Sequence, residues 1–279
     1  MLRVGLVQTT TGLDAGESAE QLASAIARLA RGGAALVFTP EMCGILDRNP
    51  ARLAAAARSE AEDPVLAAVR ATARAERVAV HLGSLAIRLP GTSRLANRGF
   101  LIGPDGAIRA RYDKLHLFDV DLADGSRYRE SASFAPGSST AVADVAGIRV
   151  GLAICYDLRF PALFQALAMA GAGLLAVPAA FTRPTGEAHW HILLRARAIE
   201  TGSFVVAAAQ TGLHADGRET YGHSLVVDPW GDVLLDMGDA PGEALVDLDP
   251  ARVAEVRSRV PTLAHARPIP APACHEQAA

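Results

Sequence analysis

Apolar segments of strand length alternate with amphipathic helical segments along almost the whole chain, and this alternation is the feature that most constrains the fold. Residues 3–8 and 34–39 are predicted strands, and Leu22, Ile26 and Leu29 recur between them at helical spacing. The run at residues 78–87 is apolar almost without interruption, as in strands that are buried on both faces. Such a chain folds as an α/β domain in which layers of helices cover the sheets.

The second half of the chain repeats the alternation and adds hairpins. Asp-Gly in the turn Pro104-Asp105-Gly106 supplies the positive φ that a tight turn needs. Hairpins mixed with βα units favour mixed sheets over a purely parallel sheet or barrel. The remaining predicted elements are strands at 78–87, 148–154, 174–179 and 204–209, hairpins at 100–112 and 224–235, and helices at 159–170, 188–201 and 251–259.

No linker, low-complexity block or internal repeat divides the chain. We therefore expect one domain over residues 1–260, followed by a tail at 261–279. The tail carries Pro268, Pro270 and Pro272, so we expect it to be extended and to dock elsewhere or stay loose. Residues 119–140 are polar and lack periodicity, and their length suggests a functional lid.

Four polar residues lie at the ends of predicted strands or in the loops just beyond them, where α/β folds place their sites: Glu41, Lys114, Glu130 and Cys155. Taken singly, each has a plainer interpretation, such as a loop carboxylate, a surface cation, a lid residue or a small buried thiol. Taken together, they supply what amide hydrolysis requires. A thiol attacks the carbonyl, a base takes its proton, and a fixed positive charge stabilises the oxyanion.

In this scheme Glu41 is the base, Cys155 forms a thioester, and Lys114 holds the oxyanion with the backbone N–H of Tyr156. The carboxylate that protonates the leaving amine can later deprotonate water, so one group serves both half-reactions.

Composition excludes several other classes of protein. The net charge of −3 and pI near 6.2 come without a block of like charges, which argues against nucleic acid and membrane surfaces as partners. The N-terminus turns polar too soon for a signal peptide, so we expect a cytoplasmic protein. Three cysteines, Cys43, Cys155 and Cys274, form no C-x-x-C pair, which disfavours a thiol redox enzyme.

Three of the candidate residues lie in short segments: 38–41 (Phe-Thr-Pro-Glu), 112–117 (Tyr-Asp-Lys-Leu-His-Leu) and 151–161 (Gly-Leu-Ala-Ile-Cys-Tyr-Asp-Leu-Arg-Phe-Pro). These segments resemble the three signature segments of the nitrilase superfamily, in the same order as in that family. The resemblance implies a four-layer αββα sandwich, a Glu-Lys-Cys triad, Glu130 as a second glutamate, no metal or organic cofactor, and a homodimer.

Within the superfamily, the chain resembles the Nit amidase branch at residues 185–190, 193–201, 221–224 and 227–231, and residues 195–201 resemble the deaminated glutathione amidases of that branch. That resemblance implies cleavage to 2-oxoglutarate and Cys-Gly. An ω-amidase acting on 2-oxoglutaramate and other dicarboxylic monoamides, an N-carbamoyl amino-acid hydrolase, and a non-catalytic scaffold stay as alternatives. The chain departs from the branch at His191 and Ala162, where the branch usually has glutamate.

Further residues are candidates for binding the small amide substrate. Arg159 could clamp a substrate carboxylate through paired hydrogen bonds, or else form an ion pair with Asp157. Thr182 and Thr185 could bond the amide or act only in the turn, and Phe181 is expected in the pocket wall.

The histidines do not predict a metal site. His189 and His191 lie two residues apart in a predicted helix, and side chains at that spacing do not face each other. We therefore expect no metal ligands.

Overall fold

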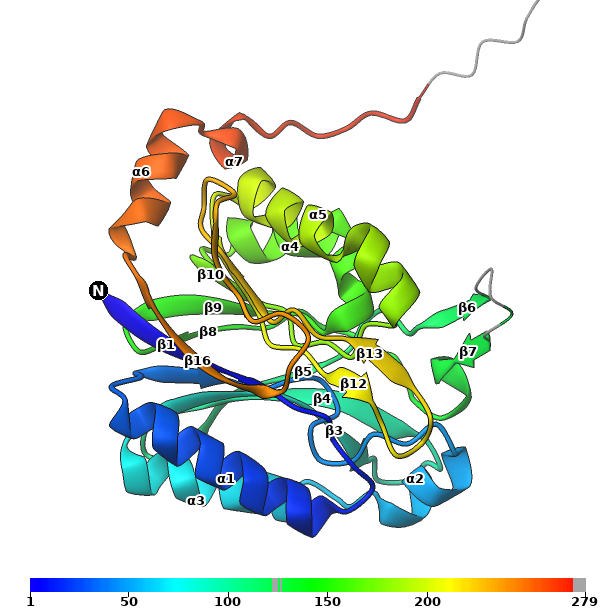
Figure 1. Cartoon of the computed structure of the whole chain (residues 1–279). Helices are drawn as coiled ribbons and strands as arrows, with labels where there is room; N and C mark the ends of the chain where they lie inside the picture. The colour runs from blue at the N-terminus through cyan, green and yellow to red at the C-terminus, as the bar shows by residue number, and fades with distance from the viewer. Residues whose placement is uncertain (122–124, 126, 273–279) are drawn as a thin grey trace, which may run out of the picture.

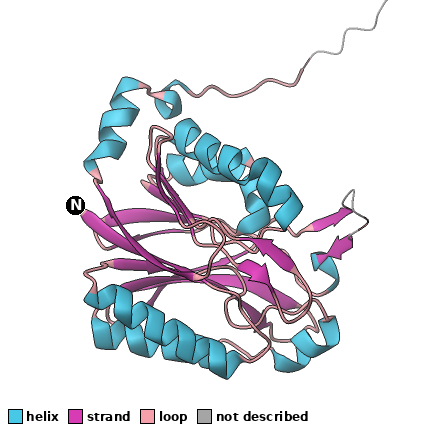
Figure 2. Cartoon of the chain, in the orientation of Figure 1, coloured by secondary structure: helices cyan, strands magenta, loops and turns pink. Residues whose placement is uncertain are grey.

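The computed structural model describes residues 1–121, 125 and 127–272. Within them, two six-stranded mixed sheets face each other, and helices cover the outer face of each sheet (Figures 1 and 2). The four-layer αββα sandwich and the mixed sheets are therefore confirmed. The main core cluster joins Leu6 and Phe38 of one sheet to Val150 and Val205 of the other, so the interface between the sheets is the centre of the molecule.

The first sheet has the order β16-β1-β2-β3-β4-β5. Its strands β1, β2 and β3 are parallel, and the other neighbours pair antiparallel. The strands are β1 (Leu2–Gln8), β2 (Leu36–Phe38), β3 (Ala79–Arg88), β4 (Leu95–Ile102), β5 (Ile108–Asp113) and β16 (Gly242–Leu248).

Helices α1 (Ala15–Arg31) and α3 (Pro64–Glu76) cover this sheet, while α2 (Pro50–Ala56) lies at its end (Figure 1). Each helix begins at a short polar side chain that caps free backbone N–H groups: Asp14, Asn49 and Asp63 accept from the first turns.

The second sheet has the order β15-β14-β11-β10-β9-β8. Helices α4 (Pro161–Met169) and α5 (Arg183–Thr201) cover its outer face (Figure 1). Its strands are β8 (Val142–Val145), β9 (Ile148–Leu152), β10 (Leu174–Ala176), β11 (Phe204–Ala207), β14 (Leu225–Val227) and β15 (Val233–Asp236). Among the described residues, no helix combines the length and apolar character that crossing a bilayer requires.

Several predicted boundaries are wrong, and two of the differences bear on the site. The helix expected over 159–170 is preceded by a separate 3-10 turn, Cys155–Arg159, and begins only at Pro161. Helix α5 begins at Arg183 rather than Ala188, which makes Thr182 its N-cap residue. Proline accounts for both starting points: Pro161 is the first residue of α4 and Pro184 the second of α5, and its fixed φ and missing N–H suit the first turn of a helix.

The expected loop at 119–140 contains a small hairpin, which projects from the sandwich (Figure 1). Its strands are β6 (Asp119–Asp121) and β7 (Arg127–Arg129), and a 3-10 turn, Glu130–Ala132, follows. Residues 122–124 and 126 of the predicted lid lie outside the described part of the chain. A second small hairpin pairs β12 (Thr211–Leu213) with β13 (Glu219–Tyr221).

The C-terminal segment is only partly as expected. Helix α6 (Ala251–Arg259) is followed by the short helix α7 (Thr262–His265), so the start of the tail is not extended. The Thr262 hydroxyl donates to the Glu200 carbonyl at the end of α5 over 3.1 Å, which docks α7 there. Residues 273–279, including Cys274, lie outside the described residues.

Candidate active site

The four predicted catalytic side chains come from four separate segments and meet in one cavity. Glu41 follows β2, Lys114 follows β5, Glu130 follows β7, and Cys155 lies three residues after β9. All four line a cavity of about 290 Å³. Glu41, Lys114 and Cys155 expose only 4%, 2% and 7% of their surface, so their charges are held away from bulk water.

The Lys114 ammonium lies between the two carboxylates. Its Nζ is 2.9 Å from Glu41 Oε1 and 2.9 Å from Glu130 Oε2. Glu41 Oε2 also accepts from the backbone N–H of Ala180 over 2.8 Å, and Glu130 Oε2 accepts from the N–H of Phe118 over 2.7 Å. Buried charges are costly unless they are paired and hydrogen-bonded, and this arrangement meets both conditions.

Asn97 is a part of this network that the sequence analysis did not select. Its Nδ2 donates to Glu41 Oε1 over 2.9 Å and to Glu130 Oε1 over 3.0 Å, so it joins the two carboxylates directly. Asn97 lies within β4 and is 1% exposed. A buried amide inside a strand needs hydrogen-bond partners. That position was the available signal in the sequence.

Cys155 is held in a strained conformation at the start of the 3-10 turn. Its φ of +49° falls in the left-handed region, which is uncommon for residues other than glycine. Its backbone N–H donates to the Pro178 carbonyl over 2.9 Å. Strain of this kind costs about 1–3 kcal/mol and persists where the surroundings impose it, often at functional sites.

Asp157 supplies much of that restraint. Its Oδ2 accepts from the Ile154 N–H over 2.9 Å and from the Tyr112 hydroxyl over 2.7 Å. Its Oδ1 accepts from the His116 N–H over 3.1 Å and lies 2.7 Å from His116 Nδ1. The fully buried carboxylate thus ties the turn after β9 to the segment that carries Lys114. Both Asp157 and Tyr112 lie in the recognised motifs, but their contact follows only from the fold.

The electrostatics favour proton transfer inside the cavity. Burial and the neighbouring Glu41 carboxylate raise the pKa of the Cys155 thiol well above its ordinary value, although Lys114 acts against them. Burial also raises the pKa of Glu41, but Lys114 and Asn97 outweigh it and the net pKa is lowered. Burial acts to lower the pKa of Lys114, yet Glu130 and Glu41 raise it well above its ordinary value. Near neutral pH the site therefore holds a thiol, a carboxylate and an ammonium.

Most of the predicted substrate-binding residues line the same cavity: Tyr156, Phe181, Thr182 and Thr185. The two threonine hydroxyls lie 2.8 Å apart at the start of α5. Tyr156 is the second residue of the 3-10 turn, where the first N–H groups of a helix lack intrahelical acceptors. Its N–H is therefore suited to receive a ligand.

Arg159 is the exception, because it is not among the residues that line the cavity. Its guanidinium carbon lies 5.4 Å from the centre of the Phe181 ring, and Nη1 lies 3.3 Å from His189 Nδ1. It makes no ion pair with Asp157 in the described structure, since His116 and Tyr112 occupy that carboxylate. The geometry places Arg159 against the aromatic wall of the cavity.

Other arginines do line the cavity, and the sequence analysis missed them: Arg48, Arg127, Arg129 and Arg218. Arg218 Nε lies 3.6 Å from Asp216 Oδ2, and Arg48 Nε donates to the Asp216 carbonyl over 2.9 Å. They come from loops and from the β6–β7 hairpin, where sequence periodicity carries no information. A cavity with several guanidinium groups is suited to an anionic ligand.

The fold and this cavity define a class of protein. The family model of carbon-nitrogen hydrolases matches residues 3–258, and the chain belongs to that family. The protein is therefore a hydrolase of amide carbon–nitrogen bonds, as the motifs predicted.

Individual proteins and solved structures are also similar to this chain. The deaminated glutathione amidase of Yersinia enterocolitica is 41% identical over 266 residues, which are 95% of this chain and 92% of that protein. The structure of the Caenorhabditis elegans NitFhit protein is 35% identical with a TM-score of 0.88, and the match covers 95% of this chain and 65% of that chain. An amidase from Nesterenkonia sp. AN1 is 30% identical with a TM-score of 0.77 over 93% of this chain and 98% of its own. That structure is of a mutant of the amidase and shows the result of Michael addition of acrylamide at the active-site cysteine.

Proposed function

We propose that Cys155 is the nucleophile of this hydrolase and that Glu41, Lys114 and Glu130 complete its catalytic set. The observation that carries the proposal is the network of two carboxylates on one ammonium beside the buried thiol. Since the pKa of Cys155 is raised, the thiol must lose its proton as it attacks, and Glu41 is the adjacent base.

In the first half-reaction, the sulfur bonds to the amide carbon while Glu41 takes the thiol proton. Lys114 and the Tyr156 N–H stabilise the oxyanion of the tetrahedral intermediate. Glu41 then gives its proton to the leaving nitrogen, the C–N bond breaks and a thioester remains. In the second half-reaction, Glu41 deprotonates a water molecule that attacks the thioester, and the acid is released with the thiol restored. Glu130 holds Lys114 and helps to orient the water.

We propose deaminated glutathione as the substrate, hydrolysed to 2-oxoglutarate and Cys-Gly, a reaction of metabolite repair. The support is the relative at 41% identity that carries this name, together with the cavity arginines, since this substrate bears a carboxylate at each end. A cavity of about 290 Å³ lies at the lower end of the range for small-molecule sites, roughly 300–1,000 Å³. This size suits a small amide rather than a protein substrate.

The two leading substrates give the same acyl-enzyme, so a difference in kcat/KM between them reports the preference for the leaving amine. Cleavage of deaminated glutathione or of 2-oxoglutaramate leaves the same 2-oxoglutaryl group on Cys155, so the two differ only in the leaving amine. The experiment measures kcat/KM for both amides and for an N-carbamoyl amino acid, with intact-mass analysis of the enzyme during turnover. We expect the highest efficiency on deaminated glutathione and one acyl adduct shared by the first two substrates.

Cys155→Ala is the control, and it should form no adduct and turn over none of the amides. A higher kcat/KM on 2-oxoglutaramate than on deaminated glutathione would indicate an ω-amidase instead. Absence of any adduct, with equal activity in wild type and Cys155→Ala, would indicate a scaffold and reject the catalytic set.

We propose that Arg218 and its neighbours at the cavity bind the substrate carboxylates and that Arg159 orients Phe181. Arg218→Ala should raise KM for deaminated glutathione by about 10-fold or more, as expected for loss of a charged hydrogen bond. Arg159→Ala serves as the matched charge-removing control and should change KM less. A larger rise in KM for Arg159→Ala than for Arg218→Ala would assign the binding of the substrate carboxylate to Arg159.

We further propose a cytoplasmic homodimer in which residues 1–260 form the hydrolase domain and 261–279 a tail. Ile192 and Ile199 lie one above the other on α5 and are 69% and 52% exposed, and Met169 of α4 is 60% exposed. An exposed apolar stripe on one helical layer favours pairing with a second copy. Light scattering should give twice the chain mass, and a monomer at micromolar concentration would rule out the dimer.

A further inference from the structure

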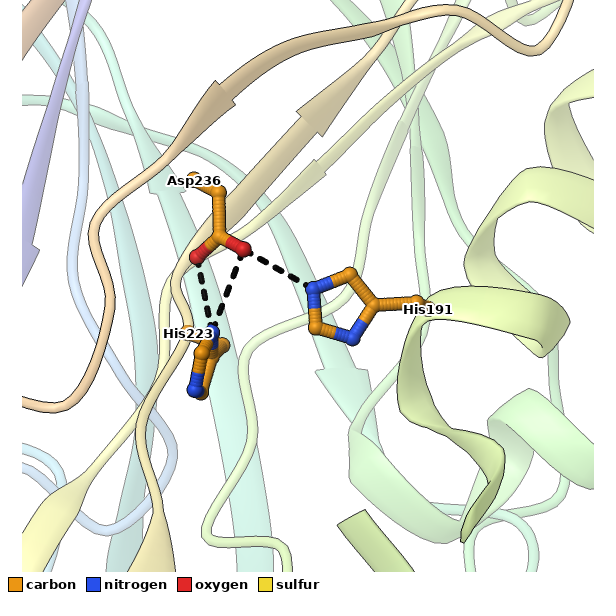
Figure 3. Close-up of side chains that lie close together, drawn as sticks. All are labelled: His191, His223 and Asp236. Atoms are coloured by element: carbon orange, nitrogen blue, oxygen red, sulfur yellow. Dashed lines mark hydrogen bonds and ion pairs between the residues drawn. The ribbon is translucent and has the colours of Figure 1, made fainter. Parts of the chain in front are cut away.

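A second cluster of chemically competent side chains lies outside the cavity, on the α5 side of the second sheet. His191 comes from α5, His223 from the connection between β13 and β14, and Asp236 from the end of β15 (Figure 3). Figure 3 shows both imidazoles turned toward the carboxylate. His191 Nε2 is 2.9 Å from Asp236 Oδ2, and His223 Nδ1 is 2.9 Å from Oδ1.

The backbone around this cluster is preorganised. His223 has φ +54°, the left-handed region that is uncommon outside glycine. Its N–H donates to the Gly238 carbonyl over 2.6 Å, and its carbonyl accepts from Trp190 Nε1 over 2.8 Å. The Tyr221 ring stacks on its imidazole with centroids 4.4 Å apart. Strain held by bonds on both sides of a residue is typical of functional positions.

The ligand set matches that of a divalent transition-metal ion. Imidazole nitrogen and carboxylate oxygen bind Zn²⁺ at roughly 2.0–2.2 Å, which places neighbouring ligand atoms of a tetrahedral site about 3.3 Å apart. The nitrogen–oxygen distances of 2.9 Å need to open by only a few tenths of an ångström, and all three ligand atoms lie within 4.8 Å of one another. The side chains are 34%, 26% and 33% exposed, so an ion can enter and keep a water ligand.

We propose that His191, His223 and Asp236 form an open site for a late first-row divalent ion, with Zn²⁺ as its representative. The three ligands come from three separate segments, so a bound ion ties α5 to the second sheet. Because α5 begins beside Thr182 and Thr185 of the cavity, the ion also holds the start of that helix in place. The site is independent of the proposed substrate and mechanism.

This proposal departs from the expectation that no metal ligands are present. His189 and His191 do not act as a pair, as their spacing indicated, since His189 lies against Arg159. The partners of His191 come instead from positions 32 and 45 residues further along the chain. Their proximity depends on the tertiary fold.

The test uses full-length protein in which Cys155 and Cys274 are replaced by alanine, so that these thiols do not compete for metal. Co²⁺ is added to report the coordination by its visible spectrum, and Zn²⁺ affinity is measured by calorimetry and competition with Co²⁺. We expect one ion per chain, a cobalt spectrum of tetrahedral or five-coordinate type without a thiolate charge-transfer band, and a Tm rise of about 5–10 °C at 100 times Kd.

His191→Ala and Asp236→Asn should each weaken Zn²⁺ binding by about 100-fold or more, because the first removes a direct ligand and the second replaces an anionic carboxylate ligand by a neutral amide. His265→Ala, on exposed α7, is the matched control and should leave the affinity unchanged. Circular dichroism and the metal-free Tm establish that each variant is folded. Equal Zn²⁺ affinity in wild type and the two ligand variants would overturn the site. A Kd for Zn²⁺ of about 0.1 mM or weaker, as expected of ordinary surface histidines, would overturn it as well.

Discussion

Replacement of Asp157 by asparagine tests the claim that this carboxylate holds the nucleophile turn. Asparagine has the same shape but presents an amide NH₂ in place of one oxygen. Both oxygens of Asp157 accept a backbone N–H, Oδ1 from His116 and Oδ2 from Ile154. In either orientation, the new NH₂ group therefore faces a buried donor.

The magnitude follows from these contacts. A buried donor left without an acceptor costs about 1–3 kcal/mol, and loss of the charge weakens the remaining hydrogen bonds by about 1 kcal/mol each. The sum is about 3–5 kcal/mol, which lowers Tm by about 10 °C in a domain of this size. Tyr112→Phe removes the hydrogen bond to Asp157 and the long one, 3.3 Å, that the hydroxyl accepts from the Leu115 N–H, but it leaves the Ile154 and His116 donors paired with Asp157, so a smaller drop of about 5 °C is expected.

Activity should fall with the stability of the turn. Cys155 keeps its φ of +49° because the surrounding bonds impose it, and a misplacement of about 1 Å costs about 100-fold in rate. The assays are thermal unfolding and kcat/KM on the best amide, well below the Tm of each variant. The role given to Asp157 would be refuted if the Tm of the variant lay within about 2 °C of wild type, which is experimental scatter, and kcat/KM fell less than about threefold.

Three further predictions concern the network and its support. The pKa of Glu41 is below its ordinary value of 4.5 and that of Lys114 above its ordinary 10.5, so kcat/KM should be level between about pH 6 and 9 and fall on the acid side, with a midpoint below 4.5, as Glu41 is protonated; an acid midpoint above 4.5 would contradict this. Lys114→Met leaves Glu41 and Glu130 without their cation and should lower Tm at pH 7 by about 10 °C but less at pH 5, because burial without Lys114 raises the pKa of Glu41 and lets it take up a proton; equal losses at both pH values would count against the pairing. Gly83→Ala puts a Cβ 2.2 Å from a backbone oxygen just before Glu41 and should destabilise by about 3 kcal/mol in urea unfolding, whereas Gly242→Ala meets no atom within 4 Å and should be neutral; similar effects of the two would refute the packing argument.

Much of the site was predictable because its chemistry resides in short motifs at strand ends. Glu41 and Cys155 follow the apolar strands β2 and β9, and Lys114 follows β5. Polar residues just beyond strand ends are where α/β folds place their sites, so the motifs identified the residues, while the facing of the two sheets brought them together. Asn97 could not be assigned in this way, because an amide within a strand has no role until its cross-strand neighbours are known. The sequence analysis did not identify the cavity arginines for a related reason. Loops and short hairpins have no periodicity from which to infer where a side chain points.

The sequence by itself determined the class of fold, the order of the strands and helices, and the identity of the reacting groups, because periodicity and local motif are properties of neighbouring residues. Only the tertiary structure decided which groups touch. It put Lys114 between two glutamates, drew Asp157 onto the segment that carries Lys114, and brought His191 to His223 and Asp236. These contacts depend on packing between residues far apart in the chain, and the distances that set their pKa values and binding chemistry exist only once the layers have assembled.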